Sequence, residues 1–184
     1  NKFGHRLDRY AAPPSLTGTY CAYTPTHNHV LEYGMRDGAA YDANHPYDNL
    51  DYRFYANILY DGSVYKGQTL NMHTTDGVAG TDLQPYGTST TAGYTLTGYY
   101  MGKFVDETQN IDNNDTYASK QNYIIWRLAE AKLDYAEVLF NLGYTEEARA
   151  QVNDIRQRVH MDALPTITID QILNERRVEL AFEE

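Results

Sequence analysis

The sequence predicts a mainly α-helical fold, in which a tetratricopeptide-like helical repeat scaffold is packed with a loop-rich, tyrosine-rich region. Residues 121–184 repeat apolar side chains at spacings of three and four, the period of an amphipathic helix. Residues 1–120 instead hold most of the tyrosines, glycines and prolines, a composition typical of loops, turns and short strands. We therefore divide the chain into a loop-rich region, 1–120, and a helical region, 121–184.

In the loop-rich region, the segment 52–60 fits either a strand or a short helix, and Asp61-Gly62 ends it as a turn. Residues 64–67 are then expected to return as the second arm of a hairpin. The segment 95–104 is a further candidate strand. A connection this long with little regular structure normally has a binding role or packs on a larger scaffold.

Two helices are expected next. The first covers residues 126–142, because its apolar residues share one face: Leu128, Ala131, Tyr135, Leu139 and Leu142. Gly143 follows at the position where a left-handed cap ends a helix. Thr145 is expected to cap the second helix, whose apolar stripe consists of Ala148, Val152, Ile155 and Val159.

A third helix is predicted after Pro165, where Thr168 and Gln171 fit a capping box. Its apolar face would consist of Ile169, Ile172, Leu173 and Leu180. Arg176 and Arg177 lie between Glu175 and Glu179, and this pattern favours ion pairs over an anion-binding site.

The first two helices have the spacing of a tetratricopeptide hairpin, with small or apolar residues where the helices approach: Ala136, Leu139, Gly143, Ala148 and Val152. An ordinary helical hairpin is the alternative, because only one copy of the pattern is visible. Since such repeats normally stack in threes or more, we expect the rest of the array to lie outside these residues.

Composition excludes several classes of protein. The formal net charge of −10 argues against a nucleic-acid partner, which needs a basic face. Cys21 is the single cysteine, so no internal disulfide is possible. His27 and His29 lack further ligands at a recognisable spacing, and we predict no metal site. We predict no cofactor and no catalytic residues, because no nucleophile elbow or phosphate-binding loop is present and no carboxylate pair stands out.

The 18 tyrosines are the best clue to a ligand. A tyrosine ring offers a flat apolar face and its hydroxyl offers a hydrogen bond, a combination that suits a sugar. The candidate ligand-binding residues are Tyr20 and Tyr23, which flank Cys21, and Tyr99 and Tyr100. For most tyrosines the alternative is packing of the region, with the hydroxyls at its surface.

Several stretches together resemble the SusD/RagB family of nutrient-binding lipoproteins. Residues 126–137 are similar to its Arg-Leu-Ala-Glu…Tyr-Ala-Glu helix, residues 146–156 to its next helix, and residues 174–183 to its Glu-Arg-Arg-x-Glu-Leu-x-Phe-Glu signature. Weaker similarities precede them in family order, at residues 33–38, 51–54 and 97–104. Tyr52 stands where the family usually has proline.

The resemblance implies a helical, SusD-like fold whose loop-rich region, 1–120, faces the ligand. It implies binding of a glycan or other nutrient without catalysis, and delivery to a SusC-like TonB-dependent transporter. Such proteins lie on the outer face of the outer membrane, held by a lipid anchor that would be outside this chain. Family members are far longer, so we interpret the chain as a piece of a longer protein. The alternative function is a repeat-type protein-interaction module without its own ligand site.

Overall fold

The computed structural model describes residues 24–76, 78–80, 82, 95, 97–105, 107, 122 and 124–183. The chain divides into two compact units. One, here called the strand unit, consists of residues 1–29 and 56–123, and the other, the helical unit, consists of residues 30–55 and 124–184. The amino-acid composition changes near the junction at 123/124, where the second part of the helical unit begins. The composition did not indicate that the segment 30–55 belongs to the same unit as the helices.

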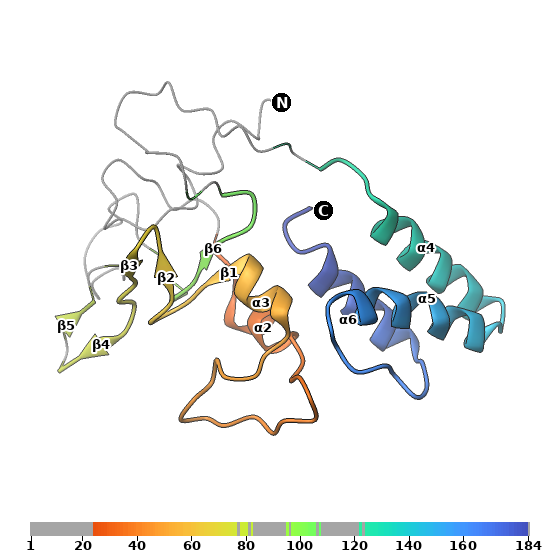
Figure 1. Cartoon of the computed structure of the whole chain (residues 1–184), viewed down its shortest axis with the longest axis horizontal. Coiled ribbons are helices and arrows are strands. Elements are labelled where there is room, and N and C mark those ends of the chain that lie inside the picture. Colours follow the sequence, from red (N-terminus) through yellow and green to blue (C-terminus); the bar gives the residue numbers. More distant parts are fainter. Residues whose placement is uncertain are drawn as a thin grey trace. The chain divides into compact units, whose positions relative to one another are not determined.

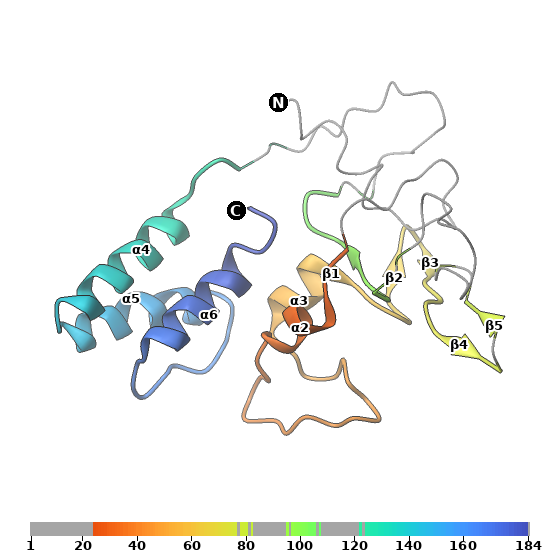
Figure 2. The same ribbon diagram turned by 180° about the vertical axis from the view of Figure 1, so that it is seen from behind.

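Three helices form most of the helical unit: α4 (Leu128–Asn141), α5 (Thr145–Arg158) and α6 (Ile169–Glu179). Helices α4 and α5 run antiparallel, as Figures 1 and 2 show, and α6 also contacts α4. Their shared core consists of Ala129, Leu133, Ala136, Val152, Ile155, Ile172 and Leu180. The predicted hairpin of the first two helices is present, while its assignment as a tetratricopeptide repeat stays a prediction.

The apolar face predicted for the first helix was wrong except for Leu139, which is buried. The core-facing residues of α4 are Ala129, Leu133, Ala136 and Leu139. Most large side chains of the predicted face are exposed, at 68% for Leu128, 53% for Tyr135 and 67% for Leu142. Both sets recur at spacings of three and four, so periodicity could not decide between them. The stripe predicted for the second helix is correct for Ala148, Val152 and Ile155, which are all buried.

The turn between α4 and α5 is a Schellman motif. Gly143 has φ of +87°, and its N–H donates to the Phe140 carbonyl at 3.0 Å, while the Tyr144 N–H donates to the Leu139 carbonyl at 2.9 Å. The predicted cap at Gly143 is therefore confirmed. The cap predicted at Thr145 is wrong, because the short turn makes Tyr144 the N-cap residue and Thr145 already helical.

The capping box predicted for the third helix is confirmed. The Gln171 N–H donates to Thr168 Oγ1 at 3.2 Å, and the Thr168 N–H donates to Gln171 Oε1 at 2.9 Å. Each bond satisfies a backbone donor that the first turn of a helix otherwise leaves without an intrahelical partner.

Thr168→Ala is expected to lower the free energy of unfolding by about 1 kcal/mol, because it removes the side-chain half of this capping box. Thr145→Ala is the matched control and should stay within about 0.5 kcal/mol, since Thr145 makes no cap. Urea denaturation measures both changes. Equal losses for the two variants would contradict the capping assignment.

The segment 30–55 contributes an irregular loop and the start of a short helix to the helical unit. A bridge between Met35 and Leu50 closes the loop, and the Arg36 N–H donates to the Asn49 carbonyl at 2.8 Å. Helix α2 (His27–Leu31) precedes the loop and α3 (Tyr52–Asn57) follows it. Tyr52 is the first residue of α3, a position that also suits proline, because the N–H that proline lacks has no helical partner there.

The strand unit contains short antiparallel pairs. Strand β1 (Ile58–Leu59) pairs with β6 (Tyr100–Met101), β2 (Val64–Tyr65) with β3 (Gln68–Thr69), and β4 (Thr74–Thr75) with β5 (Val78–Ala79). Within the candidate strand 95–104, the described strand is β6 alone. A small core gathers Leu59, Tyr65, Leu70, Met72 and Tyr100.

The predicted pairing of 64–67 with the segment before it was wrong. The ambiguous segment 52–60 forms α3 followed by β1, and β2 pairs with β3 instead. The two residues between β2 and β3, Lys66 and Gly67, have φ of +49° and +75°. Positive φ at both central residues is the geometry of the two-residue turn that best matches strand twist, so this tight hairpin forms in place of the predicted one.

Candidate functional site

The structure divides the four candidate ligand tyrosines into two pairs. Tyr20 and Tyr23, together with Cys21, lie outside the described residues. Tyr99 and Tyr100 lie in the strand unit, where 4% and 0% of their surface is exposed. Ring faces buried to this extent favour the packing role that was the alternative for most tyrosines.

Tyr100 links three parts of the strand unit. Its ring lies in the small core, and its hydroxyl donates to the Asp82 carbonyl at 2.7 Å while accepting from the Thr95 N–H at 3.1 Å. Thr95 is itself fully buried, and its Oγ1 accepts from the Thr97 N–H at 3.1 Å. The Tyr100 hydroxyl therefore satisfies two buried backbone groups, as buried polar atoms in proteins normally require.

Tyr99 contacts one of the two histidines considered as metal ligands. The Tyr99 hydroxyl lies 2.9 Å from His27 Nδ1, and the two rings are stacked with centroids 6.1 Å apart. Within the part of the chain that the structure describes, no group of three or more metal-binding side chains is present. His27 thus has a tyrosine partner in the same unit.

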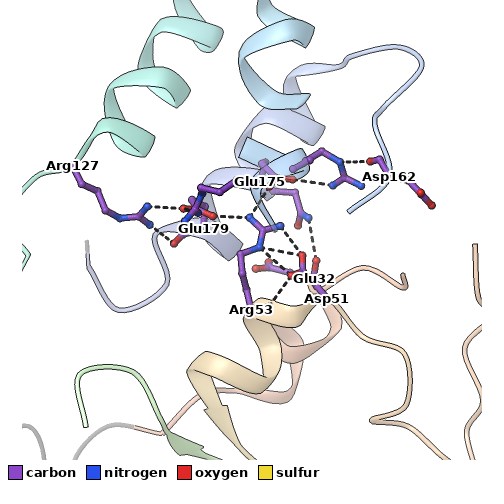
Figure 3. A network of polar contacts seen from close by, with 10 residues as sticks. Glu32, Asp51, Arg53, Arg127, Asp162, Glu175 and Glu179 are labelled. Atoms are coloured by element: carbon purple, nitrogen blue, oxygen red, sulfur yellow. Dashed lines mark hydrogen bonds and ion pairs between the residues drawn. The ribbon is translucent and has the colours of Figure 1, made fainter. Parts of the chain in front are cut away.

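A network of buried charges lies in the helical unit (Figure 3). We call it the Arg53 cluster and define it as Arg53, Asp51, Glu175 and Glu179, which are 8%, 1%, 3% and 3% exposed. Such residue types are rarely buried unless they are paired. The cluster joins the start of α3 to α6, two segments separated by more than 100 residues of sequence.

Asp51 orients the arginine. It directly precedes α3, and its Oδ1 accepts from the Arg53 backbone N–H at 2.8 Å, the geometry of a helix N-cap. The same carboxylate accepts from Arg53 Nε at 3.1 Å and from Nη2 at 2.6 Å. This two-point contact aims the remaining nitrogen, Nη1, at α6.

Arg53 Nη1 then bridges both glutamates of α6. It donates to Glu175 Oε1 at 2.6 Å and to Glu179 Oε2 at 2.9 Å. Further arginines contact the same carboxylates: Arg127 Nη1 donates to Glu179 at 2.5 Å, Arg156 Nη1 donates to Glu175 at 3.0 Å, and Arg158 pairs with Glu179. Each buried glutamate is therefore shared by at least two guanidinium groups.

The surrounding carboxylates keep the arginines charged. Burial by itself lowers the pKa of Arg53, but hydrogen bonding to Asp51 and the charges of Glu175 and Asp51 outweigh it and raise that pKa. For Arg127, burial again lowers the pKa, but hydrogen bonds to Glu183 and Glu179 and their charges outweigh this effect, so that the pKa is raised overall. A raised pKa of a cation stabilises the fold at all pH values below its unfolded-state pKa. The contribution of these arginines is therefore constant across physiological pH.

These contacts make the Arg53 cluster a structural feature, since its side chains bind one another. Sequence reasoning missed it and treated the glutamates as neighbours of Arg176 and Arg177. Those two arginines do form the predicted ion pairs, Arg177 with Glu32 at 2.8 Å and Arg176 with Asp134. The sequence did contain an indication that the two glutamates are buried. Glu175 and Glu179 follow Ile172 by three and seven residues, so they share its buried face.

A hollow of about 490 Å³ lies in the helical unit, lined by the start of α4 and the end of α5. Its three cationic side chains already have carboxylate partners, since Arg127 pairs with Glu179, Lys132 with Asp154, and Arg158 with Glu179. The hollow therefore offers no uncompensated positive charge for an anion.

None of the described helices has the combination of length and apolar character that a membrane-spanning helix requires.

Residues 4–184 match the sequence model of the SusD family. A SusD-like protein from Bacteroides fragilis NCTC 9343 is 31% identical, with a TM-score of 0.64, and the match covers 87% of this chain and 34% of that one. A SusD-like carbohydrate-binding protein from the same strain gives 23% identity and a TM-score of 0.75 over 96% of this chain and 36% of that one.

A SusD superfamily protein from Parabacteroides distasonis ATCC 8503 is 18% identical, with a TM-score of 0.51 over 97% of this chain and 34% of its own. The carbohydrate-binding protein from B. fragilis and the P. distasonis protein, which are 23% and 18% identical, show similarity of fold alone. No curated protein matches the sequence. The chain spans about a third of the length of these solved relatives. Because the family model matches almost the whole sequence, the chain belongs to the SusD family.

Proposed function

We propose that this chain is part of a cell-surface protein that binds a glycan or a similar nutrient and delivers it to a SusC-like TonB-dependent transporter. The observation that carries the proposal is the family match over residues 4–184. The protein would lie on the outer face of the outer membrane through a lipid anchor outside these residues. It would act by binding, without a chemical step.

The tyrosines support a carbohydrate ligand. We assign the ligand contact to Tyr20 and Tyr23, whose rings would stack on the C–H face of a sugar while their hydroxyls bond to its edge. The contacts of Tyr99 and Tyr100 with His27, Asp82 and Thr95 support a packing role for the second pair. Ligand contact by Tyr99 or Tyr100 would require these groups to move.

Tyr20→Ala and Tyr23→Ala are each expected to weaken glycan binding by the full-length protein about tenfold, equivalent to about 1.4 kcal/mol. The loss follows from removing a stacking surface. Isothermal titration calorimetry against a panel of soluble glycans measures it, and Tyr20→Phe is the matched control because it keeps the ring. Absence of binding to every glycan by the wild-type protein would contradict a glycan ligand and leave another nutrient class.

The same mixtures separate capture from catalysis. Chromatography after prolonged incubation should return the glycan intact, and release of shorter products would identify an enzyme. Delivery is tested by purifying the tagged full-length protein from its own membranes. A TonB-dependent transporter should copurify with it, whereas glycan binding without such a partner would contradict the delivery step alone.

A further inference from the structure

Arg36 is the exception among the described arginines, because no carboxylate pairs with its guanidinium group. Every other described arginine forms an ion pair with an aspartate or glutamate: Arg53, Arg127, Arg149, Arg156, Arg158, Arg176 and Arg177. Acids are not scarce in this sequence, which holds 25 Asp and Glu against 15 Lys and Arg. A partly buried cation without a counter-ion in so acidic a chain has unused capacity to bind an anion.

Local contacts hold the Arg36 side chain in one orientation. The bridge between Met35 and Leu50 fixes the backbone, and Arg36 Nε donates to the Leu50 carbonyl at 2.8 Å. The guanidinium carbon lies 4.0 Å from the centre of the Tyr52 ring, within the range of a cation–π contact. Within the described part of the chain Nη1 and Nη2 have no hydrogen-bond partner, so the two-pronged end of the group remains available.

A second ring, that of His160, contacts Tyr52. The two rings are nearly perpendicular, at 81°, with centroids 6.1 Å apart. Tyr52 is 47% exposed, and His160, which follows the end of α5, is also exposed. The next residue, Met161, is buried, and a β-carbon on Gly34 would lie 3.4 Å from its Cε, so the end of α5 packs against the base of the loop. The three side chains therefore gather within the helical unit.

We propose that Arg36, Tyr52 and His160, here called the Arg36 site, bind the carboxylate of an acidic sugar unit in a glycan. This role rests on the proposed glycan-binding function and specifies a uronic acid as the ligand. The two parallel N–H directions of the guanidinium fork match the two oxygens of a carboxylate. The exposed part of the Tyr52 ring offers an apolar surface to the sugar, and the His160 imidazole has an N–H donor whether it is neutral or charged.

The negative net charge of the chain does not prevent such a contact. At physiological salt, exposed charges more than about 8 Å apart are largely screened, so the neighbouring groups decide. Asp51, the acid that precedes Tyr52, is buried and held by Arg53 at 2.6 Å. Asp37 follows Arg36 in the chain, but it is exposed and forms no ion pair with that arginine.

Isothermal titration calorimetry with the full-length protein tests the Arg36 site. The probes are oligosaccharides of galacturonate, alginate and hyaluronan, each compared with its methyl ester, which keeps the sugar rings and removes the charge. The wild type should bind at least one acidic probe. Arg36→Gln should weaken that binding about 10–100-fold, the effect of losing a hydrogen bond between charged groups. The methyl ester should bind more weakly, with the same affinity for both proteins.

Three further variants separate binding from a structural role. Arg36→Lys keeps the charge but lacks the fork, so it should recover only part of the affinity. His160→Gly removes the imidazole at a backbone position of φ +58°, which suits glycine, and should weaken binding of the acidic probe severalfold. Arg177→Gln removes a surface arginine that pairs with Glu32 and should change nothing. Circular dichroism checks that each variant is folded.

Several results would overturn the carboxylate ligand. They are unchanged affinity of Arg36→Gln for the acidic probe, equal losses for acid and methyl ester, and a preference for carrageenan oligosaccharides, which carry sulfate but no carboxylate. Loss of a copurifying transporter from Arg36→Gln, with glycan affinity unchanged, would assign the arginine to a protein contact instead. Binding of neutral glycans alone overturns the Arg36 site and leaves the proposed function standing, whereas absence of binding to every glycan contradicts that function itself.

Discussion

Arg53→Met is expected to lower the free energy of unfolding by about 3–5 kcal/mol, the cost of removing one partner from a buried ion pair. Asp51, Glu175 and Glu179 are 1%, 3% and 3% exposed, and the substitution leaves all three without their shared guanidinium. Methionine fills a similar volume, so the loss reports the charge and its hydrogen bonds more than a cavity. Chemical denaturation followed by far-ultraviolet circular dichroism measures it.

Two further variants make this prediction specific. Arg53→Lys keeps the charge but lacks the planar fork that contacts Asp51 at two points while bridging α6, so a substantial part of the loss should remain. Arg177→Met removes an arginine that pairs with Glu32 near the surface and should cost less than about 1 kcal/mol. If Arg53→Met and Arg177→Met have equal effects, the Arg53 cluster contributes no more than a surface pair.

Tyr100→Ala is expected to cost about 3–5 kcal/mol, because it empties a fully buried aromatic site in the core of the strand unit. Tyr100→Phe keeps the ring and should cost about 1–3 kcal/mol, the penalty for leaving buried backbone groups unsatisfied. Those groups are the Asp82 carbonyl and the Thr95 N–H. Thermal and urea denaturation measure both changes.

The control for Tyr100 is Tyr41, which is 53% exposed, so Tyr41→Ala should stay within about 0.5 kcal/mol. The Tyr100 variants also show whether a loss of glycan binding results from unfolding or from a lost ligand contact. A glycan-binding loss in Tyr100→Ala that accompanies unfolding says nothing about ligand contact. If Tyr100→Phe is as stable as the wild type and yet loses glycan binding, the packing role is wrong and the hydroxyl contacts the ligand.

Local features of the helical unit could be predicted because neighbouring residues specify them. The capping box of Thr168 and Gln171 needs only residues three apart, and the left-handed residue that ends α4 needs only Gly143. The buried stripe of α5 was also predictable, since Ala148, Val152 and Ile155 are apolar residues in an otherwise polar helix. The family resemblance likewise came from short stretches of sequence and is confirmed.

Pairing between distant segments was not predictable in this way. Strand β1 pairs with β6, some 40 residues later, because β2 forms the tighter hairpin with β3 and does not pair with β1. The contacts of Tyr100 with Asp82 and Thr95 depend on that pairing, so the sequence could present Tyr100 only as one tyrosine among 18. Whether a ring is a ligand platform or a core residue depends on what surrounds it.

The sequence by itself determined that α4, α5 and α6 form, that Gly143 ends α4 and Thr168 caps α6, and which family the chain belongs to. Only the tertiary structure decided which of the two apolar faces of α4 enters the core, because both satisfy the helical period. It also decided that Glu175 and Glu179 are buried, since charged residues tolerate burial only when partners such as Arg53 and Arg127 are brought from far along the chain. Periodicity describes one helix at a time, whereas burial and charge pairing depend on what packs against it.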